Sequence, residues 1–477
     1  MATTTSDTES SPTKLLQDPS TAGVKTLLGD PKKAIIKLSI PMIIAMSANT
    51  IYNVTDAVWV SGLGSSALAA VGYVFPFFIM AMAFATGVGV GGGAAISRRI
   101  GSKDKQGADS TAVHTLLIMV LIALTFTVIF YFFIDEVFMH LIVDQTTFNL
   151  AVSYAKLIAL GTIVVFFAFI ATAILRSEGD ANRAMIALLF GSGLNIVLDP
   201  IFIYTLNFGI EGAAYATVLS MSIASLILFY WLFLKKNTYI TFHFKDFHLD
   251  NQIIKDILRV GIPASLMQLS MSIMMVIMNE IISGIKGDDA VAIYTVGWRI
   301  ATIAILPLVG MSTAVVSVTG AAYGAKEYLK LKVSYYYAIK IGFLIELVIA
   351  ILTFIGAPVI TLAFTQAENS ASLAPGIITL LQIICIFYPM VAFGMFSSSM
   401  FQGIGKGVNS LIVTLFRTII LTTPISLLFA YTFDLGLVGV WWGLVVANTI
   451  GSTVAFLWGR HTIFNLNHKP DPQVDKS

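Results

Sequence analysis

Charged residues are scarce in this chain: Asp, Glu, Lys and Arg together make up 11% of its 477 residues. An average soluble domain is about a quarter charged, so this sequence carries too little charge to cover a water-facing surface. Its net charge of +2 is small, and the basic residues are not gathered on one module as in nucleic-acid-binding proteins. We therefore expect a membrane protein with no nucleic-acid partner.

Cysteine and metal-ligand clusters are also missing. Cys385 is the only cysteine, which excludes an intramolecular disulfide. The six histidines are scattered, so no Cys/His metal site and no cofactor are predicted. The stretch 1–30 is polar and lacks the apolar core of a signal peptide. We predict disordered cytoplasmic tails over residues 1–30 and 463–477.

Long apolar runs take up most of the chain. The hydrophobic fraction is 57% and the mean hydropathy is +0.86. Apolar blocks of about 20 to 30 residues recur, and each is long enough to cross a bilayer as a helix. The sequence predicts an all-α integral membrane protein with about twelve spans, which are 33–62, 67–97, 109–133, 148–174, 183–206, 211–235, 253–284, 290–321, 333–358, 373–401, 408–432 and 438–460.

The connections between these spans indicate orientation and domain organisation. Lys and Arg are concentrated in the loops on one side, and the positive-inside rule places that side and both termini in the cytoplasm. The longest polar connector runs from Lys235 to Lys255. We predict a multi-pass protein of the cell membrane, with an N-terminal six-helix bundle over 31–235, a linker over 236–252 and a C-terminal six-helix bundle over 253–462.

The two halves resemble each other in sequence. Ile35–Pro41 is similar to Ile257–Pro263, and Phe208–Gly212 is similar to Leu435–Gly439, at nearly the same offset along the chain. Two bundles with an even number of spans each would be related by an axis along the membrane normal. Alternating-access carriers share this plan, with the substrate path between the bundles. The sequence therefore predicts a secondary transporter.

Two acidic residues inside the predicted spans, Asp56 and Asp199, are the main functional candidates. An ionised Asp at the bilayer centre costs about 2.5–3.5 kcal/mol, so an acid at this depth is taken as functional by default. Tyr52 precedes Asp56 by one helical turn, and Asn195 precedes Asp199 by one turn. Each pair therefore shares a helix face.

Thr217 and Tyr154 supply a hydroxyl and a phenol from two further spans. If these helices converge, the N-terminal bundle holds two carboxylates and several neutral oxygen donors. Such a set suits Na⁺, held by Asp56, Asp199, Asn195 and Thr217, or a shared proton, because two neighbouring carboxylates cannot both ionise cheaply. The alternative is structural: each Asp would cap a helix break or pair with a buried Arg.

The C-terminal half lacks the same acids. At the repeat offset, Asp56 corresponds to Met278, and Asp199 corresponds to Ile425 or Ser426. If the acids only held the fold together, both halves should keep them. Cation coupling is therefore predicted in the N-terminal bundle alone, with the substrate path beside or between the bundles.

Other residues are candidates for the substrate path or for gating: Gln268, Met271, Met278, Arg299 and Pro41. A bend at Pro41 would move the end of the first span that carries the first acid.

Two features of the spans are separate from these candidates. The glycine run 87–93 lies inside an apolar block with no Lys at nucleotide-loop spacing, which predicts close helix packing or a hinge rather than phosphate binding. Glu346 and Arg417 are further charges within spans, and the sequence assigns them no role.

Five segments carry a family resemblance: Gly29–Ile35, Trp59–Gly64, Glu178–Met185, Leu194–Phe202 and Phe401–Gly405. They resemble the multidrug and toxic compound extrusion (MATE) family, in particular its prokaryotic DinF-like branch and archaeal members, over residues from about 30 to 462. The resemblance implies two six-helix bundles arranged as a V in a monomer. It also implies export of organic cations or amphipathic drugs against Na⁺ or H⁺ entry.

The resemblance further implies that Asp56, Asn195, Asp199, Thr217, Tyr52 and Tyr154 fall on the family's N-lobe cation and proton site. The other main branch places a carboxylate in the seventh span, where this chain has Met271 with Gln268 nearby. A coupling site of that kind in the C-terminal half is therefore not expected.

Two other functions compete with drug export. A flippase for a lipid-linked precursor would need several Arg or Lys in the central cavity to bind a pyrophosphate head, and the sequence offers few. An intramembrane enzyme or receptor is disfavoured, because the spans hold no nucleophile and base pair, metal set or cofactor motif. The sequence leaves the substrate and the choice between Na⁺ and H⁺ open.

Overall fold

The computed structural model describes residues 21–235, 237–242, 247–364 and 368–467. All regular structure in these ranges is helical, and twelve helical segments are long and apolar enough to span a membrane. The predicted all-α membrane fold with twelve spans is confirmed. Large apolar side chains on the helix surfaces, such as Phe132 (71% exposed) and Ile355 (72% exposed), would face the lipid.

The N-terminal half contains six spanning segments. They are α2 (Pro31–Ser61), α3 (Ser65–Gly101), α4 (Lys105–Leu141), α5 (Gln145–Ser177), α6 (Ala181–Pro200) continued by the π-helical η1 (Ile201–Thr205), and α7 (Gly209–Phe229) continued by η2 (Tyr230–Leu234).

The C-terminal half also contains six spanning segments, several of them interrupted. They are α8 (Asn251–Lys286), α9 (Asp288–Ala304) with α10 (Leu306–Gly324), α11 (Tyr328–Leu362), η3 (Glu368–Leu373) with α12 (Ala374–Ile384), η4 (Cys385–Phe387) and α13 (Tyr388–Gly403), then α14 (Gly407–Leu415), η5 (Phe416–Leu421), α15 (Thr422–Leu427) and η6 (Leu428–Thr432), and finally α16 (Gly436–Asn467).

The prolines differ in their effect on the helices. The predicted span 290–321 is divided into α9 and α10, and Pro307 lies in the first turn of α10. Proline fits there because the N–H groups of a first helical turn have no intrahelical acceptor. Pro41 and Pro263 instead lie inside α2 and α8, which continue through them.

The tails are shorter than the sequence predicted. Within the predicted disordered stretch 1–30, residues Ala22–Leu28 form helix α1, which is capped by the Thr21 side chain and buries Val24 and Leu27. Burial of these two apolar side chains offsets the entropy of ordering so short a helix. At the other end, α16 extends past the predicted boundary at 462 to Asn467. Residues 1–20 and 468–477 of the predicted tails lie outside the described residues.

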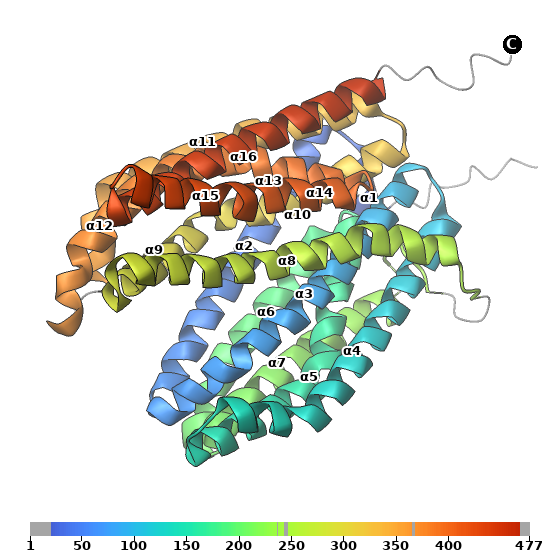
Figure 1. Ribbon diagram of the computed structural model, residues 1–477. Coiled ribbons are helices and arrows are strands. Elements are labelled where there is room, and N and C mark those ends of the chain that lie inside the picture. The colour runs from blue at the N-terminus through green and yellow to red at the C-terminus, as the bar shows by residue number, and fades with distance from the viewer. Residues whose placement is uncertain (1–20, 236, 243–246, 365–367, 468–477) are drawn as a thin grey trace, which may run out of the picture.

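The two halves form two lobes arranged as a V (Figure 1). The lobes spread apart at one end, called here the open end. They meet at the other end, called the closed end, where α1 and the C-terminal end of α16 lie. A contiguous set of buried apolar side chains runs through both lobes, and a smaller cluster that includes Phe138 and Ile210 lies in the N-terminal lobe.

Glycines allow the helices of the two lobes to approach each other closely. A Cβ added to Gly91 of α3 would lie 2.3 Å from the carbonyl oxygen of Ile257 in α8. A Cβ on Gly310 of α10 would lie 2.7 Å from the backbone nitrogen of Ile43 in α2. The predicted role of the glycine run in close helix packing is therefore confirmed.

The contact between α3 and α10 follows the internal repeat. A Cβ on Gly101 would meet the carbonyl oxygen of Ala321 at 1.9 Å, and a Cβ on Gly324 would meet that of Arg98 at 1.8 Å. Gly324 is the repeat counterpart of Gly101, and Ala321 is the counterpart of Arg98 at the same offset. The two helices therefore cross on the pseudo-twofold axis, each packing a glycine on the other's backbone.

Candidate cation and proton site

Four helices of the N-terminal lobe bring the predicted polar residues together. Asp56 comes from α2 and Asp199 from α6, and their carboxyl groups lie within hydrogen-bonding reach of each other. Asp199 and Asn195 are completely buried, and Thr217 of α7 is nearly so. The structure thus joins residues that lie far apart in the sequence, from the first span to the sixth.

Asn195 links the second carboxylate to α7. With its amide nitrogen facing the carboxylate, Nδ2 donates to Oδ2 of Asp199 at 2.9 Å, and Oδ1 accepts from Oγ1 of Thr217 at 3.3 Å. Asn195 and Asp199 lie one turn apart on one helix face, as their spacing predicts. This chain of hydrogen bonds holds one carboxylate oxygen of Asp199 in a fixed direction.

Two tyrosines border the carboxylates. The hydroxyl of Tyr52, on α2, lies close to the side chain of Thr217. Tyr154 of α5 interacts electrostatically with both acids and packs on a small apolar cluster that includes Val60 and Ile203. All six predicted residues of the N-terminal bundle therefore surround one point in the lobe.

The structural alternatives for the two acids find no support in the described part of the chain. None of the ion pairs found there involves Asp56 or Asp199. One carboxylate oxygen of Asp56 is buried without a hydrogen-bond partner. Asp199 precedes Pro200 and the π-helical η1, but its carboxylate accepts a hydrogen bond from the Asn195 side chain rather than capping the break. Both carboxyl groups remain available to a cation or a proton.

The C-terminal lobe keeps the geometry of this region without the acids. The π-helical turns η1 and η6 are separated by the same offset as Phe208–Gly212 and Leu435–Gly439, which makes Ser426 rather than Ile425 the counterpart of Asp199. The Ser426 hydroxyl is buried without a partner, and Met278 is completely buried in the core. Glu346, the buried acid of this lobe, lies on α11 with neither oxygen hydrogen-bonded among the described residues.

The candidates for the substrate path lie on three helices and differ in exposure. Gln268 and Met271 are exposed on α8, and Arg299 is exposed on α9. Met278 is enclosed by apolar neighbours, which does not support a place on an open path. Pro41 is buried in α2, about four turns before Asp56 on the same helix.

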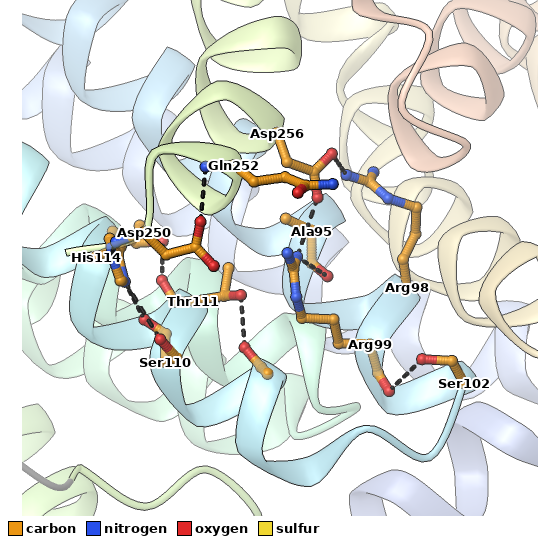
Figure 2. Close-up of polar contacts among 12 residues, drawn as sticks. Ala95, Arg98, Arg99, Ser102, Ser110, Thr111, His114, Asp250, Gln252 and Asp256 are labelled. Atoms are coloured by element: carbon orange, nitrogen blue, oxygen red, sulfur yellow. Dashed lines mark hydrogen bonds and ion pairs between the residues drawn. The ribbon is translucent and has the colours of Figure 1, made fainter. Parts of the chain in front are cut away.

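Sequence reasoning missed a polar cluster at the closed end, shown in Figure 2. Arg98 and Arg99 of α3 pair with Asp256 of α8, and His114 of α4 accepts a hydrogen bond from the backbone N–H of Asp250. By sequence alone, the two arginines count only among the loop charges that set orientation. The sequence offered one signal for this cluster. At the positions of the other lobe that are equivalent to the two arginines, the repeat has alanines, so the two halves differ in charge there.

Glu178 is a second group whose environment the sequence did not reveal. It lies between α5 and α6, is 1% exposed, and accepts a hydrogen bond from the backbone N–H of Ile240 in the linker at 3.0 Å. Burial raises the pKa of Glu178 to about 8. Its protonation state is therefore tied to the packing of the linker on the N-terminal lobe.

The family profile MatE matches residues 41–201 and 263–428, more than half of the chain and parts of both lobes. The chain belongs to the MatE family. Multidrug export protein MepA of Staphylococcus haemolyticus is 28% identical over 428 residues, which cover 89% of this chain and 92% of MepA. Its relatives and its membrane spans make this MatE protein a multi-pass multidrug efflux transporter rather than an enzyme.

Solved structures agree with this MatE assignment. A MOP superfamily transporter from Pyrococcus furiosus is 48% identical with a TM-score of 0.91, covering 94% of this chain and 100% of that one. A structure described as the outward-facing conformation of a multidrug resistance MATE family transporter has the same TM-score, identity and coverage. The V-shaped arrangement of two lobes expected from the family resemblance is confirmed.

Proposed function

We propose that this MatE protein is an antiporter that exports organic cations or amphipathic drugs in exchange for Na⁺ or H⁺ bound between Asp56 and Asp199. The observation that carries the proposal is the pair of neighbouring carboxyl groups inside a membrane lobe with no cationic partner among the described residues. Two such groups cannot both stay ionised in an apolar lobe, so the site demands a cation or a proton.

The surrounding donors fit either ion. Asn195, Thr217 and Tyr52 offer neutral oxygens, the ligand type that hard cations prefer. A proton shared by the two carboxyl groups would meet the same electrostatic demand. Entry of either ion changes the charge at a point where α2, α6 and α7 meet, so binding is coupled to the packing of these helices.

We propose that the closed end faces the cytoplasm and that the protein acts as a monomer with both termini on that side. Arg98, Arg99 and Lys330 lie at the closed end, and basic residues remain on the cytoplasmic side of a membrane. The open end then faces the outside, where drug leaves and the coupling ion enters. Thiol labelling of a Gln106→Cys variant from only one side of sealed cells tests this orientation.

The deciding experiment is efflux of a fluorescent organic cation from proteoliposomes, with Na⁺ and pH gradients imposed separately. Asp56→Asn and Asp199→Asn should each abolish gradient-driven efflux while the protein still inserts. Glu346→Gln is the matched control, because it neutralises a buried acid of the other lobe and should leave efflux unchanged. Normal coupled efflux in both Asp variants would refute the proposal.

The same liposomes distinguish drug export from lipid flipping. The N-terminal lobe presents carboxylates, which repel a pyrophosphate head group and attract organic cations. Competition by a lipid pyrophosphate, rather than by a second organic cation, would favour the flippase instead.

A further inference from the structure

The two lobes are joined at the closed end by an ion-pair cluster between α3 and α8 (Figure 2). Arg98 donates from one guanidinium nitrogen to Asp256 Oδ1 at 2.6 Å and from the other to the carbonyl oxygen of Gly403, at the end of α13, at 3.0 Å. Arg99 donates to Asp256 Oδ2 at 3.0 Å. Three charge-assisted hydrogen bonds thus connect the N-terminal lobe to the C-terminal lobe. Such bonds are stronger than hydrogen bonds between neutral groups.

The position of the cluster in the fold stabilises its ion pairs. Arg98 is in the last turn of α3, where the carbonyl end of the helix dipole stabilises a cation. Asp256 lies in the second turn of α8, where its carboxylate meets both arginine side chains. The Arg98 and Asp256 side chains are 11% and 30% exposed, so water screens the pair less than it screens a surface ion pair.

The internal repeat shows that the cluster is present on one side only. Arg98 and Arg99 correspond to Ala321 and Ala322 of α10 at the repeat offset. Asp256 corresponds to Ala34 of α2 at the offset that aligns Ile35–Pro41 with Ile257–Pro263. The contact between α10 and α2, which is the counterpart of that between α3 and α8, therefore has no ion pair at the equivalent positions.

We propose that Arg98, Arg99 and Asp256 form a latch that holds the closed end shut and sets the ratio of outward-open to inward-open transporter. This inference rests on the proposed alternating-access function, in which the closed end must open to admit drug. Opening separates α3 from α8 and breaks all three hydrogen bonds, whereas the outward-open state keeps them. Asp256 is the key member because it accepts from both arginines.

The test uses distances between spin labels on the two lobes, in lipid nanodiscs, in a chain whose native cysteine is removed by Cys385→Ala. One label pair at Gln106 and Lys332 reports on the closed end, and another at Gln145 and Asp288 reports on the open end. All four side chains are exposed. The measurement follows conformation alone, so failure of drug efflux or of ion coupling leaves its result unaffected.

Asp256→Asn should create or enlarge a population with a longer closed-end distance and a shorter open-end distance. The expected enrichment is about tenfold or more, which corresponds to about 1.4 kcal/mol. Asp256→Glu should keep the parent distribution. Asp250→Asn is the matched control: it makes the same charge change at the N-cap of the same helix, where Asn also caps well.

Two results would overturn the latch. One is an Asp256→Asn distribution identical to those of the parent and of Asp250→Asn. The other is a broadened closed-end distance with no change at the open end, which would mean that Asp256 only tightens the interface. Melting temperature measured on the same samples separates loss of fold from a change of state.

Discussion

Replacing Gly91 by alanine places a methyl group directly in the contact between α3 and α8. The new Cβ would lie 2.3 Å from the carbonyl oxygen of Ile257 and 2.9 Å from the backbone nitrogen of Gly261. Both neighbours are backbone atoms, which cannot rotate away, so the helices must separate by roughly 1 Å at this point. Overpacking of this kind costs about 1–3 kcal/mol.

The proposed opening motion separates α3 from α8, so the cost falls only on the conformation in which the closed end is shut. Opening that end relieves the clash, so Gly91→Ala should shift the equilibrium toward the inward-open state by roughly 5- to 150-fold. The reporter is Ala95→Cys in the Cys385→Ala background. Ala95 is completely buried and packs on Ile253 and Ile257 at the same contact. A membrane-impermeant maleimide supplied at the closed end should label it faster in Gly91→Ala.

Gly93→Ala is the matched control on the same helix. Its Cβ would lie 3.5 Å from the carbonyl oxygen of Ala173 in α5, an ordinary contact within one lobe. Its labelling rate should stay within about twofold of the parent, since no overpacking arises. Equal labelling rates in Gly91→Ala and Gly93→Ala would refute the argument that backbone contact at Gly91 depends on the closed state.

Three further predictions concern single side chains. Burial raises the pKa of Glu178 to about 8 from an ordinary value of 4.5. The protonated side chain therefore stabilises the fold fully below pH 4.5, and this stabilisation disappears as the pH rises to about 8. The melting temperature should fall across this window, and it should fall less in Glu178→Gln. Arg417 is buried with no acceptor for its Nε among the described residues, so Arg417→Met should leave the melting temperature unchanged or raise it, and a fall of several degrees would contradict this. Thr217→Val removes the hydroxyl bonded to Asn195 at nearly constant volume and should weaken ion-driven efflux without loss of insertion; unchanged coupling in the liposome assay would count against the site.

The amino-acid sequence by itself determined the number of spans and the composition of the site. Each span is a continuous apolar block, and the free energy of placing a helix in the membrane depends on the composition of that block. The spans can therefore be predicted from local sequence alone. The pairings of Tyr52 with Asp56 and of Asn195 with Asp199 also follow from the helical repeat alone. The internal repeat then showed that only one half carries these acids.

Short helices and local irregularities within the spans were harder to predict from the sequence. Helix α1 is a short helix that depends on burial of Val24 and Leu27, which a polar composition hides. The π-helical turns η1, η5 and η6 insert into apolar runs without a distinct residue pattern. The break between α9 and α10 did have a local signal, because Pro307 stands at that point.

Only the tertiary structure decided which helix faces meet. Asp256 of α8 pairs with two arginines at the end of α3, far earlier in the chain, and nothing local connects them. Likewise, Gly91 faces α8 and Gly93 faces α5, although they are close neighbours on one helix. The physical reason is that hydrophobicity fixes how a helix crosses the bilayer but not its rotation about its own axis. That rotation is set by backbone contact at small residues and by pairing of buried charges between lobes.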